Sequence, residues 1–333
     1  MTLLKTLLAV ALTLFTTCVS AADRPNIVLI LMDDMGWRDV GFMGNTFTET
    51  PNLDRLAAGG LVFSQAYASA PNCAPTRACL MSGQYTPRHG IYTVVDPRQP
   101  PGSPWQKLLA SDSQSELDTR IVTVAESLRD GGYATGFFGM SNLGRGRSGP
   151  VTPGGQGFET VVFPENLGFG KDQYFDDSGN YLSDRLTDSV LQFVEKNRSG
   201  PFFVYLPDHA VHAPYNPKPD LLKKYEQKLQ QTGDRRDSAE AAATVEAVDQ
   251  NVGRIMDGLK SMNLLENTIV IFTSDNGGTP QFTAPLKGSK GQLYEGGIRV
   301  PLVVSWPGLK NPGRTTPVPV SSVDWYPTLL ERS

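Results

Sequence analysis

Residues 26–34 have the sequence NIVLILMDD, an apolar run that ends in two aspartates. A run of this length without alternating polar residues is typical of a parallel strand that is buried on both faces of a sheet. In open α/β sheets, ligands bind outside the carboxyl ends of such strands. We therefore predict a buried strand over residues 26–32, with Asp33 and Asp34 at the functional edge of the sheet.

Strand-like and helix-like segments alternate along the rest of the chain. Strands are predicted at residues 61–65, 134–138, 202–206, 268–273 and 300–306. Helices are predicted at residues 51–59, 123–131, 182–197 and 238–262. This alternation predicts an α/β fold with a mostly parallel central sheet and helices on both faces. Residues 96–118, 141–177 and 207–237 interrupt the pattern, and we expect them to be long loops around a site.

The composition is that of a globular protein with a substantial core. The chain has 333 residues, of which 39% are hydrophobic and 19% are charged. The formal net charge is −4 and there is no block of Lys or Arg, so we expect no nucleic-acid partner.

The first 22 residues have the features of a secretory signal sequence. Lys5 is followed by a short apolar run at residues 6–17 and by small residues at 20–22. We therefore predict a signal peptide at residues 1–22, a secreted or periplasmic protein, and no membrane contact after cleavage. A lipoprotein is the alternative because of Cys18, but Thr17 is bulkier than a lipid-attachment site usually accepts.

Polar side chains follow three of the predicted strands. They are, in chain order, Asp33-Asp34, then His209 and His212, then Asp275-Asn276. Because the carboxyl ends of parallel strands meet at one edge of a sheet, we expect these groups to converge. Carboxylate and amide oxygens suit Ca²⁺ or Mg²⁺. A single Asp-Asp pair is more often a turn or a helix cap, but two acidic pairs that each follow a buried strand favour a metal site.

Residues 73–83 have the sequence CAPTRACLMSG. Pro75 is placed to begin a helix and Gly83 to end it. We therefore expect Cys73 at a helix N-terminus, where free N–H groups favour an anion. Arg77, one turn further on, adds a fixed positive charge. Cys79 is the other cysteine of the predicted mature chain, and export permits a disulfide between the two, although two cysteines make no disulfide framework.

The chain resembles the type I sulfatases of the alkaline phosphatase superfamily. Their Cys-x-Pro-x-Arg signature, followed by a small-residue helix and Ser/Thr-Gly, is matched by residues 73–83. Further matches, in the family's order, are residues 26–37, 50–57, 274–278, 287–291 and 294–301. The resemblance thus extends from the start of the predicted mature chain to its last part.

The resemblance implies a hydrolase that cleaves the sulfate monoester of an aryl or carbohydrate alcohol, with a sulfated small molecule or glycan as substrate. It implies that a formylglycine-generating maturation enzyme oxidises Cys73 to an aldehyde, and that the hydrate of this formylglycine attacks sulfur. The resemblance also implies roles for single residues. Arg77 stabilises the modified Cys73, Lys290 binds the sulfate, and His212 protonates the leaving alcohol. The residues implied to bind Ca²⁺, with Mg²⁺ as the alternative ion, are Asp33, Asp34, Cys73, Asp275 and Asn276.

Alternative interpretations exist for several of these residues. Cys73 is alternatively a plain buried cysteine, or one bonded to Cys79. His209 is the less favoured acid, because the family match places His212 at the working position. His89 is predicted to be a structural residue in a turn. Lys287 is predicted to be a surface charge.

Residues 139–144 (GMSNLG) depart from the family pattern Gly-Lys-Trp-His-Leu-Gly. Met140 replaces a lysine that contacts the sulfate, and Asn142 replaces a histidine. A hydrogen bond to a charged group is worth about 1.5–3 kcal/mol, and a positioned acid or base about 10²–10⁴ in rate. We therefore expect slower turnover, unless Arg145 or Arg147 from the same loop supplies the missing charge.

Family members usually continue into a smaller C-terminal subdomain with its own antiparallel sheet. This sequence ends within a predicted helix that begins near Asp324. We expect residues 23–333 to form the sulfatase catalytic domain, truncated before that subdomain, with an exposed apolar edge where the subdomain would dock.

Two other functions are weighed against sulfate-ester hydrolysis. The first is a phosphomonoester or phosphonate monoester hydrolase of the same superfamily, although Lys290 and a single-metal ligand set favour sulfate. The second is a degenerate, non-catalytic protein that binds sulfated ligands, which Met140, Asn142 and the early end of the chain motivate.

Overall fold

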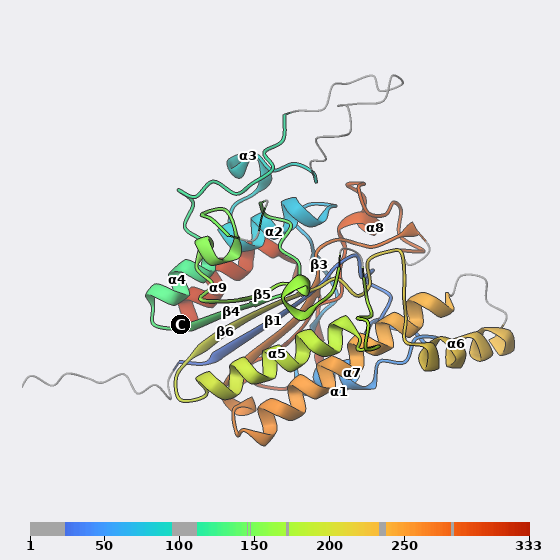
Figure 1. Cartoon of the computed structure of the whole chain (residues 1–333). Coiled ribbons are helices and arrows are strands. Elements are labelled where there is room, and N and C mark those ends of the chain that lie inside the picture. Colours follow the sequence, from blue (N-terminus) through green and yellow to red (C-terminus); the bar gives the residue numbers. More distant parts are fainter. Residues whose placement is uncertain are drawn as a thin grey trace, which may run out of the picture.

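The computed structural model describes residues 24–94, 112–144, 146, 148–170, 173–232, 238–280 and 283–333 (Figure 1). The signal peptide predicted at residues 1–22, including Cys18, and the two charges considered at Arg145 and Arg147 lie outside these residues. In the described ranges, no helix is both long enough and apolar enough to cross a membrane.

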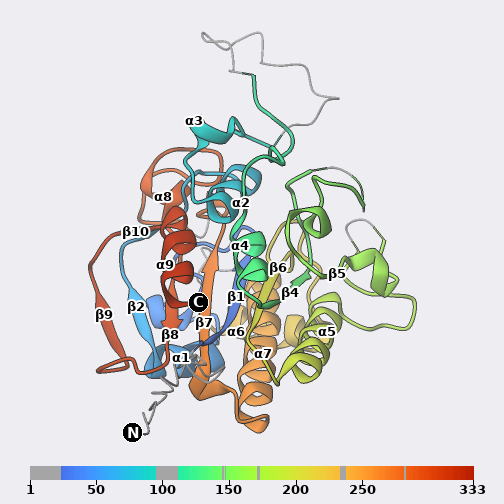
Figure 2. The ribbon, with the colours of Figure 1, turned by 90° about the vertical axis from the view of Figure 1, so that its left-hand side faces the viewer.

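A sheet forms the centre of the fold, and eight strands of the described residues contribute to it. Their order is β5-β4-β6-β1-β7-β8-β2-β9, which runs from right to left in Figure 2. The strands are β1 (Asn26–Met32), β2 (Leu61–Phe63), β4 (Ala134–Phe138), β5 (Thr160–Val162), β6 (Phe202–Asp208), β7 (Thr268–Ser274), β8 (Val303–Ser305) and β9 (Arg314–Thr316). β8 is antiparallel to both of its neighbours, and the other pairs are parallel. The predicted mostly parallel sheet is confirmed.

Helices cover both faces of this sheet (Figure 1). One face is covered by α1 (Pro51–Gly59), α5 (Leu182–Asn197) and α7 (Ala239–Ser261), and the other by α2 (Cys73–Ser82), α4 (Val124–Asp130) and α9 (Trp325–Arg332). Side chains of β1 pack alternately into the two layers, Val28, Ile30 and Met32 into the first and Ile27, Leu29 and Leu31 into the second. Because each fully buried aliphatic side chain contributes about 1.5–3 kcal/mol, this unbroken apolar run is the natural central strand.

Local signals in the sequence set the ends of two helices on the second face. At α4, Thr123 Oγ1 accepts from Glu126 N at 3.1 Å and Glu126 Oε2 accepts from Thr123 N at 2.8 Å, which is the predicted capping box. α2 ends at Ser82, and the capping residue Gly83 has a left-handed φ of +64°. It begins at Cys73, two residues before the predicted start at Pro75. A proline is tolerated there because the N–H groups of the first turn have no partner within the helix.

One predicted loop contains a helix. Residues 207–237 include α6 (Pro219–Thr232), which packs on α7 through Leu221 and Tyr225. These two residues lie four apart and so face the same side of a helix, while most of the remaining positions are polar or charged. The loop prediction was wrong because the charged composition concealed this narrow apolar stripe.

The other elements are short, and several boundaries differ from those predicted. β2 and β8 are shorter than expected, β6 continues to Asp208, and β5 lies within the predicted loop 141–177. A two-stranded sheet pairs β3 (Ala66–Tyr67) with β10 (Val320–Ser321). The short helices are α3 (Thr86–His89) and α8 (Glu295–Ile298), with 3₁₀ turns at Gly41–Met43, Pro153–Gln156, Pro164–Leu167, Leu265–Asn267 and Ser322–Asp324.

Candidate active site

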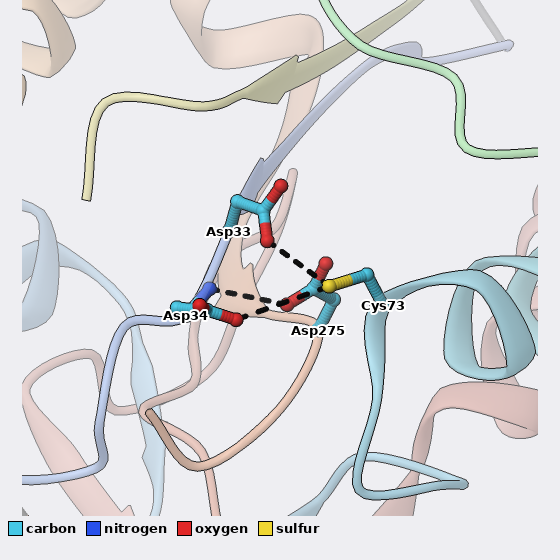
Figure 3. Close-up of side chains that lie close together, drawn as sticks. All are labelled: Asp33, Asp34, Cys73 and Asp275. Atoms are coloured by element: carbon cyan, nitrogen blue, oxygen red, sulfur yellow. Dashed lines mark hydrogen bonds between the residues drawn. The ribbon is translucent and has the colours of Figure 1, made fainter. Parts of the chain in front are cut away.

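Four side chains with metal-binding atoms converge at the carboxyl ends of β1 and β7 (Figure 3). Asp33 and Asp34 follow β1, Asp275 follows β7, and Cys73 is the first residue of α2. One ligand atom from each of the four lies within 4.8 Å of the others. Asn276 lies beside them, and its Nδ2 donates to Asp34 Oδ1 and Asp275 Oδ1, both at 2.7 Å. The structure thus brings together the five residues predicted to bind a metal, which we call the acidic cluster.

Hydrogen bonds of the sheet extend past the strand ends and fix this cluster. Asp33 N donates to Asp208 O and Asp275 N donates to Met32 O, each at 3.1 Å. Asp34 has a left-handed φ of +65°, which is uncommon for a residue other than glycine. Consecutive side chains of an extended strand point to opposite faces. The left-handed turn at Asp34 interrupts that alternation, so that both carboxylates reach one site.

Arg77 is fully buried and pairs with two of the carboxylates. Its Nη2 lies 3.0 Å from Asp33 Oδ2 and 2.8 Å from Asp275 Oδ2, and its Nε lies 2.9 Å from the same Asp275 oxygen. Burial alone would lower the pKa of the guanidinium, but Asp33 and Asp275 raise that pKa above its ordinary value. Arg77 is therefore a permanent positive charge inside the site.

The pKa values of Asp33 and Asp275 are shifted in opposite directions. Burial would raise the pKa of Asp33, but Arg77 and His209 outweigh it and hold that pKa well below its usual range. The pKa of Asp275 is raised, first by burial and then by the neighbouring charge of Asp33. In the described part of the chain, the three carboxylates pair with the cations Arg77 and Lys290 and also lie beside His209 and His212. Their carboxylate oxygens are ligands that fit a hard divalent cation.

The thiol of Cys73 is buried within hydrogen-bonding distance of the aspartates in the cluster. Its Sγ lies 3.2 Å from Asp33 Oδ1 and 3.9 Å from Asp34 Oδ1. Burial raises the pKa of the Cys73 thiol, and the carboxylates of Asp275 and Asp33 raise it further. The group is therefore a protonated thiol, which is a poor nucleophile. Cys73 and Cys79 are both free, so the alternative of a disulfide between them is wrong.

The second cysteine has a structural environment. Cys79 Sγ lies 3.3 Å from His89 Nε2, and His89 Nδ1 accepts from Ile91 N at 3.1 Å. His89 is buried at the end of α3. These contacts agree with the structural role predicted for His89.

Lys290 and His212 contact the acidic cluster from its solvent side. Lys290 Nζ lies 2.6 Å from Asp34 Oδ2, and His212 Nε2 lies 3.5 Å from the same oxygen. His212 Nδ1 lies 2.6 Å from Ala213 O and must carry a proton, because a carbonyl oxygen can only accept. About a third of the His212 side chain is exposed.

His209 is closer to the cluster than its sequence position suggested. Its Nδ1 lies 3.0 Å from Asp33 Oδ2, and its ring stacks on that of His212 with the centroids 4.5 Å apart. The sequence feature that indicated a contact with the cluster was the position of His209, directly after β6 and three residues before His212. The resemblance to the family favoured His212 as the acid instead.

The loop after β4 reaches the site through its backbone. Met140 N donates to Pro207 O at 3.1 Å, and Met140 O accepts from Arg77 Nη1. Asn142, two residues on, has a left-handed φ of +56°. The two residues that depart from the expected pattern therefore belong to a loop that touches the site, and neither has a side chain that can supply a positive charge.

Lys287 lies apart from the cluster contacts described above. Its Nζ lies 3.8 Å from the centre of the half-exposed Tyr294 ring, a cation–π geometry. This contact agrees with the surface charge predicted for Lys287.

Known proteins resemble this chain over nearly its whole length. A sequence model of the Sulfatase family matches residues 25–332. The chain is 32% identical over 382 residues to a protein of Formosa agariphila named Sulfatase, covering 93% of this chain and 68% of that protein. It is 32% identical to human arylsulfatase A and 31% identical to human N-acetylgalactosamine-6-sulfatase, covering 93% of this chain and 64% and 62% of theirs. The chain thus spans about two thirds of the length of these relatives.

Solved structures show the same architecture. The crystal structure of Ps i-CgsB in complex with k-i-k-neocarrahexaose has 30% identity and a TM-score of 0.77, covering 93% of this chain and 72% of that one. The phosphonate monoester hydrolase of Agrobacterium radiobacter has 20% identity and a TM-score of 0.68, covering 93% of this chain and 73% of that one. The second likeness shows the fold alone. Together they confirm the predicted fold class.

Proposed function

The chain belongs to the sulfatase family, and on this basis we propose that it hydrolyses a sulfate monoester and that Cys73 is the source of its nucleophile. The observation that supports this most directly is the position of Cys73 at the start of α2, with its sulfur 3.2 Å from Asp33 Oδ1. A sulfate bound beside this residue would meet the free N–H groups of the first helical turn and the charge of Arg77. The site therefore suits a tetrahedral anion next to a side chain that can be modified.

The unmodified thiol is unsuited to attack, because it is protonated and donates to Asp33. We propose that a maturation enzyme oxidises Cys73 with molecular oxygen as the oxidant: the Cβ–Sγ bond breaks, the sulfur leaves as hydrogen sulfide, and Cβ becomes the aldehyde carbon of formylglycine. This aldehyde adds water to become a geminal diol. One hydroxyl of the diol attacks sulfur, and the bond from sulfur to the alcohol oxygen breaks. The second hydroxyl then loses its proton, the aldehyde re-forms, and sulfate leaves with the bonding electron pair. Each turnover consumes one water molecule, which restores the diol.

The acidic cluster is proposed to hold Ca²⁺, with Mg²⁺ as the alternative, through Asp33, Asp34, Asp275, Asn276 and the modified Cys73. When bound, the cation supplies Lewis-acid polarisation of the sulfate and offsets negative charge on the carboxylates. Arg77 holds the Asp33 and Asp275 carboxylates in place through its buried ion pairs.

His212 is proposed to protonate the leaving alcohol, and Lys290 to bind sulfate oxygens. Because the Nδ1 proton of His212 is engaged with Ala213 O, the imidazolium form offers its second proton from Nε2. This nitrogen faces the cluster, 3.5 Å from Asp34 Oδ2. Lys290 contacts the same oxygen and is partly exposed, so its ammonium group can turn to an incoming sulfate.

A sulfated glycan or a small sulfated alcohol is proposed as the substrate. Relatives with 30% identity or more include an N-acetylgalactosamine-6-sulfatase and a structure in complex with neocarrahexaose. The signal sequence predicted at residues 1–22 supports a secreted or periplasmic site of action, where such glycans are met.

The test combines mass spectrometry with two activity assays. The protein is purified from a host that has a formylglycine-generating enzyme, and the peptide containing Cys73 is weighed. The expected result is the mass of the aldehyde, together with release of sulfate from an aryl sulfate and much slower release of phosphate from the matching aryl phosphate. An unmodified thiol in this host would contradict the proposed nucleophile, and faster phosphate release would favour the phosphatase alternative.

A second candidate function is binding of a sulfated ligand without turnover. The observation that favours it is the loop after β4, where Met140 contacts Arg77 through its backbone and offers no charge to a sulfate. An acid or base that is missing from the site can cost about 10²–10⁴ in rate, and an amide such as that of Asn142 cannot take its place near neutral pH. Tight binding of a sulfated oligosaccharide with no sulfate released by formylglycine-containing protein would establish this function instead.

A further inference from the structure

Tyr174 links a distant loop to the turn that contains both histidines. It lies between the 3₁₀ turn Pro164–Leu167 and α5, and it is almost completely buried. Its hydroxyl donates to His212 O at 2.9 Å and to His209 O at 3.2 Å, a shared hydrogen bond from one proton to two carbonyls. The same tyrosine therefore contacts the backbone of both histidines.

The rings of these residues form a stack. The ring of Tyr174 lies 6.0 Å from that of His209 and nearly parallel to it, at 9°, and His209 in turn stacks on His212. The two imidazoles end this stack at the acidic cluster, with His209 Nδ1 3.0 Å from Asp33 Oδ2 and His212 Nε2 3.5 Å from Asp34 Oδ2. A shift of Tyr174 would therefore change the position of both imidazoles relative to the carboxylates.

Tyr174 is held by contacts that do not involve the histidines. Its carbonyl accepts from Leu182 N at 2.9 Å, at the start of α5. Its ring belongs to an apolar cluster with Phe47, Tyr181 and Tyr225. Tyr174 and the histidines both lie outside the regular elements, the histidines between the end of β6 and the start of α6. Tyr174 therefore has anchors of its own, and its hydroxyl connects them to the histidine turn.

We propose that Tyr174 is a positioning residue for acid catalysis, which fixes the His209–His212 turn so that His212 Nε2 is aligned with the leaving alcohol. The effect on turnover rests on the proposed sulfatase function, in which His212 is the acid. Tyr174 itself touches neither the acidic cluster nor the sulfate subsite in the contacts described, so it acts through the histidines. Misplacement of a catalytic group by about 1 Å can cost about 10²-fold in rate.

The test compares substrates that differ in their need for an acid. 4-Nitrophenolate leaves readily without a proton, whereas 4-methylphenolate is a poor leaving group that needs one. Tyr174→Phe keeps the ring but removes the donor to both carbonyls. It is expected to lower kcat for 4-methylphenyl sulfate about tenfold or more, and kcat for 4-nitrophenyl sulfate less than about threefold. Equal losses on both substrates, or no loss on either, would overturn the proposal.

Tyr181→Phe is the matched control. Tyr181 is also buried and lies 6.4 Å from Tyr174 ring to ring, but within the described residues its hydroxyl has no hydrogen-bond partner. This variant makes the same chemical change in the same cluster without touching either histidine. It is expected to retain the wild-type ratio of the two rates, and melting curves of both variants check that they are folded.

A double-mutant cycle separates positioning from a general loss of structure. If Tyr174 acts through His212, Tyr174→Phe should add no further loss of kcat for 4-methylphenyl sulfate in a His212→Ala background, whereas a separate structural role would multiply the two losses. The imidazole ¹H–¹⁵N signals of His209 and His212 give a readout without turnover: they are expected to shift in Tyr174→Phe, and unchanged signals would overturn the proposal. A wild-type protein that contains formylglycine and releases no sulfate would instead refute the proposed function.

Discussion

Arg77 and Asp275 form an ion pair from which water is excluded. Both side chains are fully buried; Asp275 Oδ2 accepts from Arg77 Nε at 2.9 Å and lies 2.8 Å from Arg77 Nη2. Removal of one partner from such a pair leaves a buried charge without compensation, which costs about 3–5 kcal/mol. The pair connects α2 to the end of β7, so it supports both the fold and the site.

Arg77→Met is therefore expected to lower the free energy of unfolding by about 3–5 kcal/mol, measured by urea denaturation. The control is Arg55→Met, because the Arg55–Asp257 pair has the same chemistry with more than half of each side chain exposed. Exposed pairs contribute about 0–1 kcal/mol. A similar decrease in the free energy of unfolding in the two variants would contradict the stabilising role assigned to the buried Arg77–Asp275 pair.

Cys73→Ala is expected to abolish release of sulfate while the protein stays folded, because the side chain that becomes the nucleophile is removed. Cys79→Ser is the matched control, since Cys79 lies in the same helix and contacts His89 rather than the acidic cluster. The control is expected to retain the aldehyde at position 73 and most of the activity. Residual activity of Cys73→Ala above the background of the purified host protein would refute the proposed nucleophile.

Removal of calcium is expected to lower both activity and melting temperature, because a bound ion stabilises the folded state and the three carboxylates then lie together without their metal ion. Dialysis against EGTA followed by titration with Ca²⁺ measures this, and recovery of both quantities is the expected outcome. Asp275→Asn should reduce the recovery of activity and melting temperature when Ca²⁺ is added back. Asp257→Asn, a change at an exposed carboxylate, should leave this recovery unchanged. A melting temperature that EGTA and Ca²⁺ leave unchanged would argue against the metal site.

Met140→Lys together with Asn142→His is expected to raise kcat for an aryl sulfate about tenfold or more. The lysine would add a charged hydrogen bond worth about 1.5–3 kcal/mol near Arg77, and the histidine would add a group able to transfer a proton. Met140→Leu is the control for a change of shape without charge. If the double variant is no faster than the wild type, the departures in this loop do not limit turnover.

The pH dependence of stability provides a separate prediction at Asp39. Burial raises the pKa of this carboxyl to about 8, although its Oδ2 accepts from Gly36 N at 2.7 Å. Between pH 4 and 8, the folded protein therefore keeps a proton that the unfolded chain has released, so stability falls as the pH rises through this window. Asp39→Asn retains an acceptor and should reduce the drop in melting temperature from pH 5 to pH 8. An unchanged drop would show that Asp39 is ionised in the fold.

The parts of the fold that depend on near neighbours were predictable. The apolar run of β1, the capping box of Thr123 and Glu126, and Gly83 at the end of α2 each show their role within a few residues of sequence. The convergence of Asp33 with Asp275 was also predictable, because parallel strands place their carboxyl ends at one edge of the sheet. The roles proposed for these residues in metal binding and catalysis stay predictions.

Features that depend on contacts between distant segments were not predictable. Helix α6 was not predicted because its apolar stripe is narrow, and Leu221 and Tyr225 are buried only through their contact with α7. The contact of His209 with Asp33 joins residues 176 positions apart, and that of Tyr174 with His209 joins residues 35 apart. No spacing in the sequence indicates which tyrosine of a long irregular segment will lie against a particular histidine.

Burial of Cys73 has a consequence for the order of events during biosynthesis. Its sulfur is enclosed by side chains that include Asn276, which is synthesised 203 residues later. Under the proposed function, an enzyme that oxidises this sulfur must reach it before the later segments have closed over it. Oxidation and folding would then compete in time, and a molecule that folds first would keep its thiol and lack the proposed nucleophile although its structure is intact. The specific activity of a preparation would then report the fraction of molecules that were oxidised before they folded. A substitution that speeds folding would lower this specific activity.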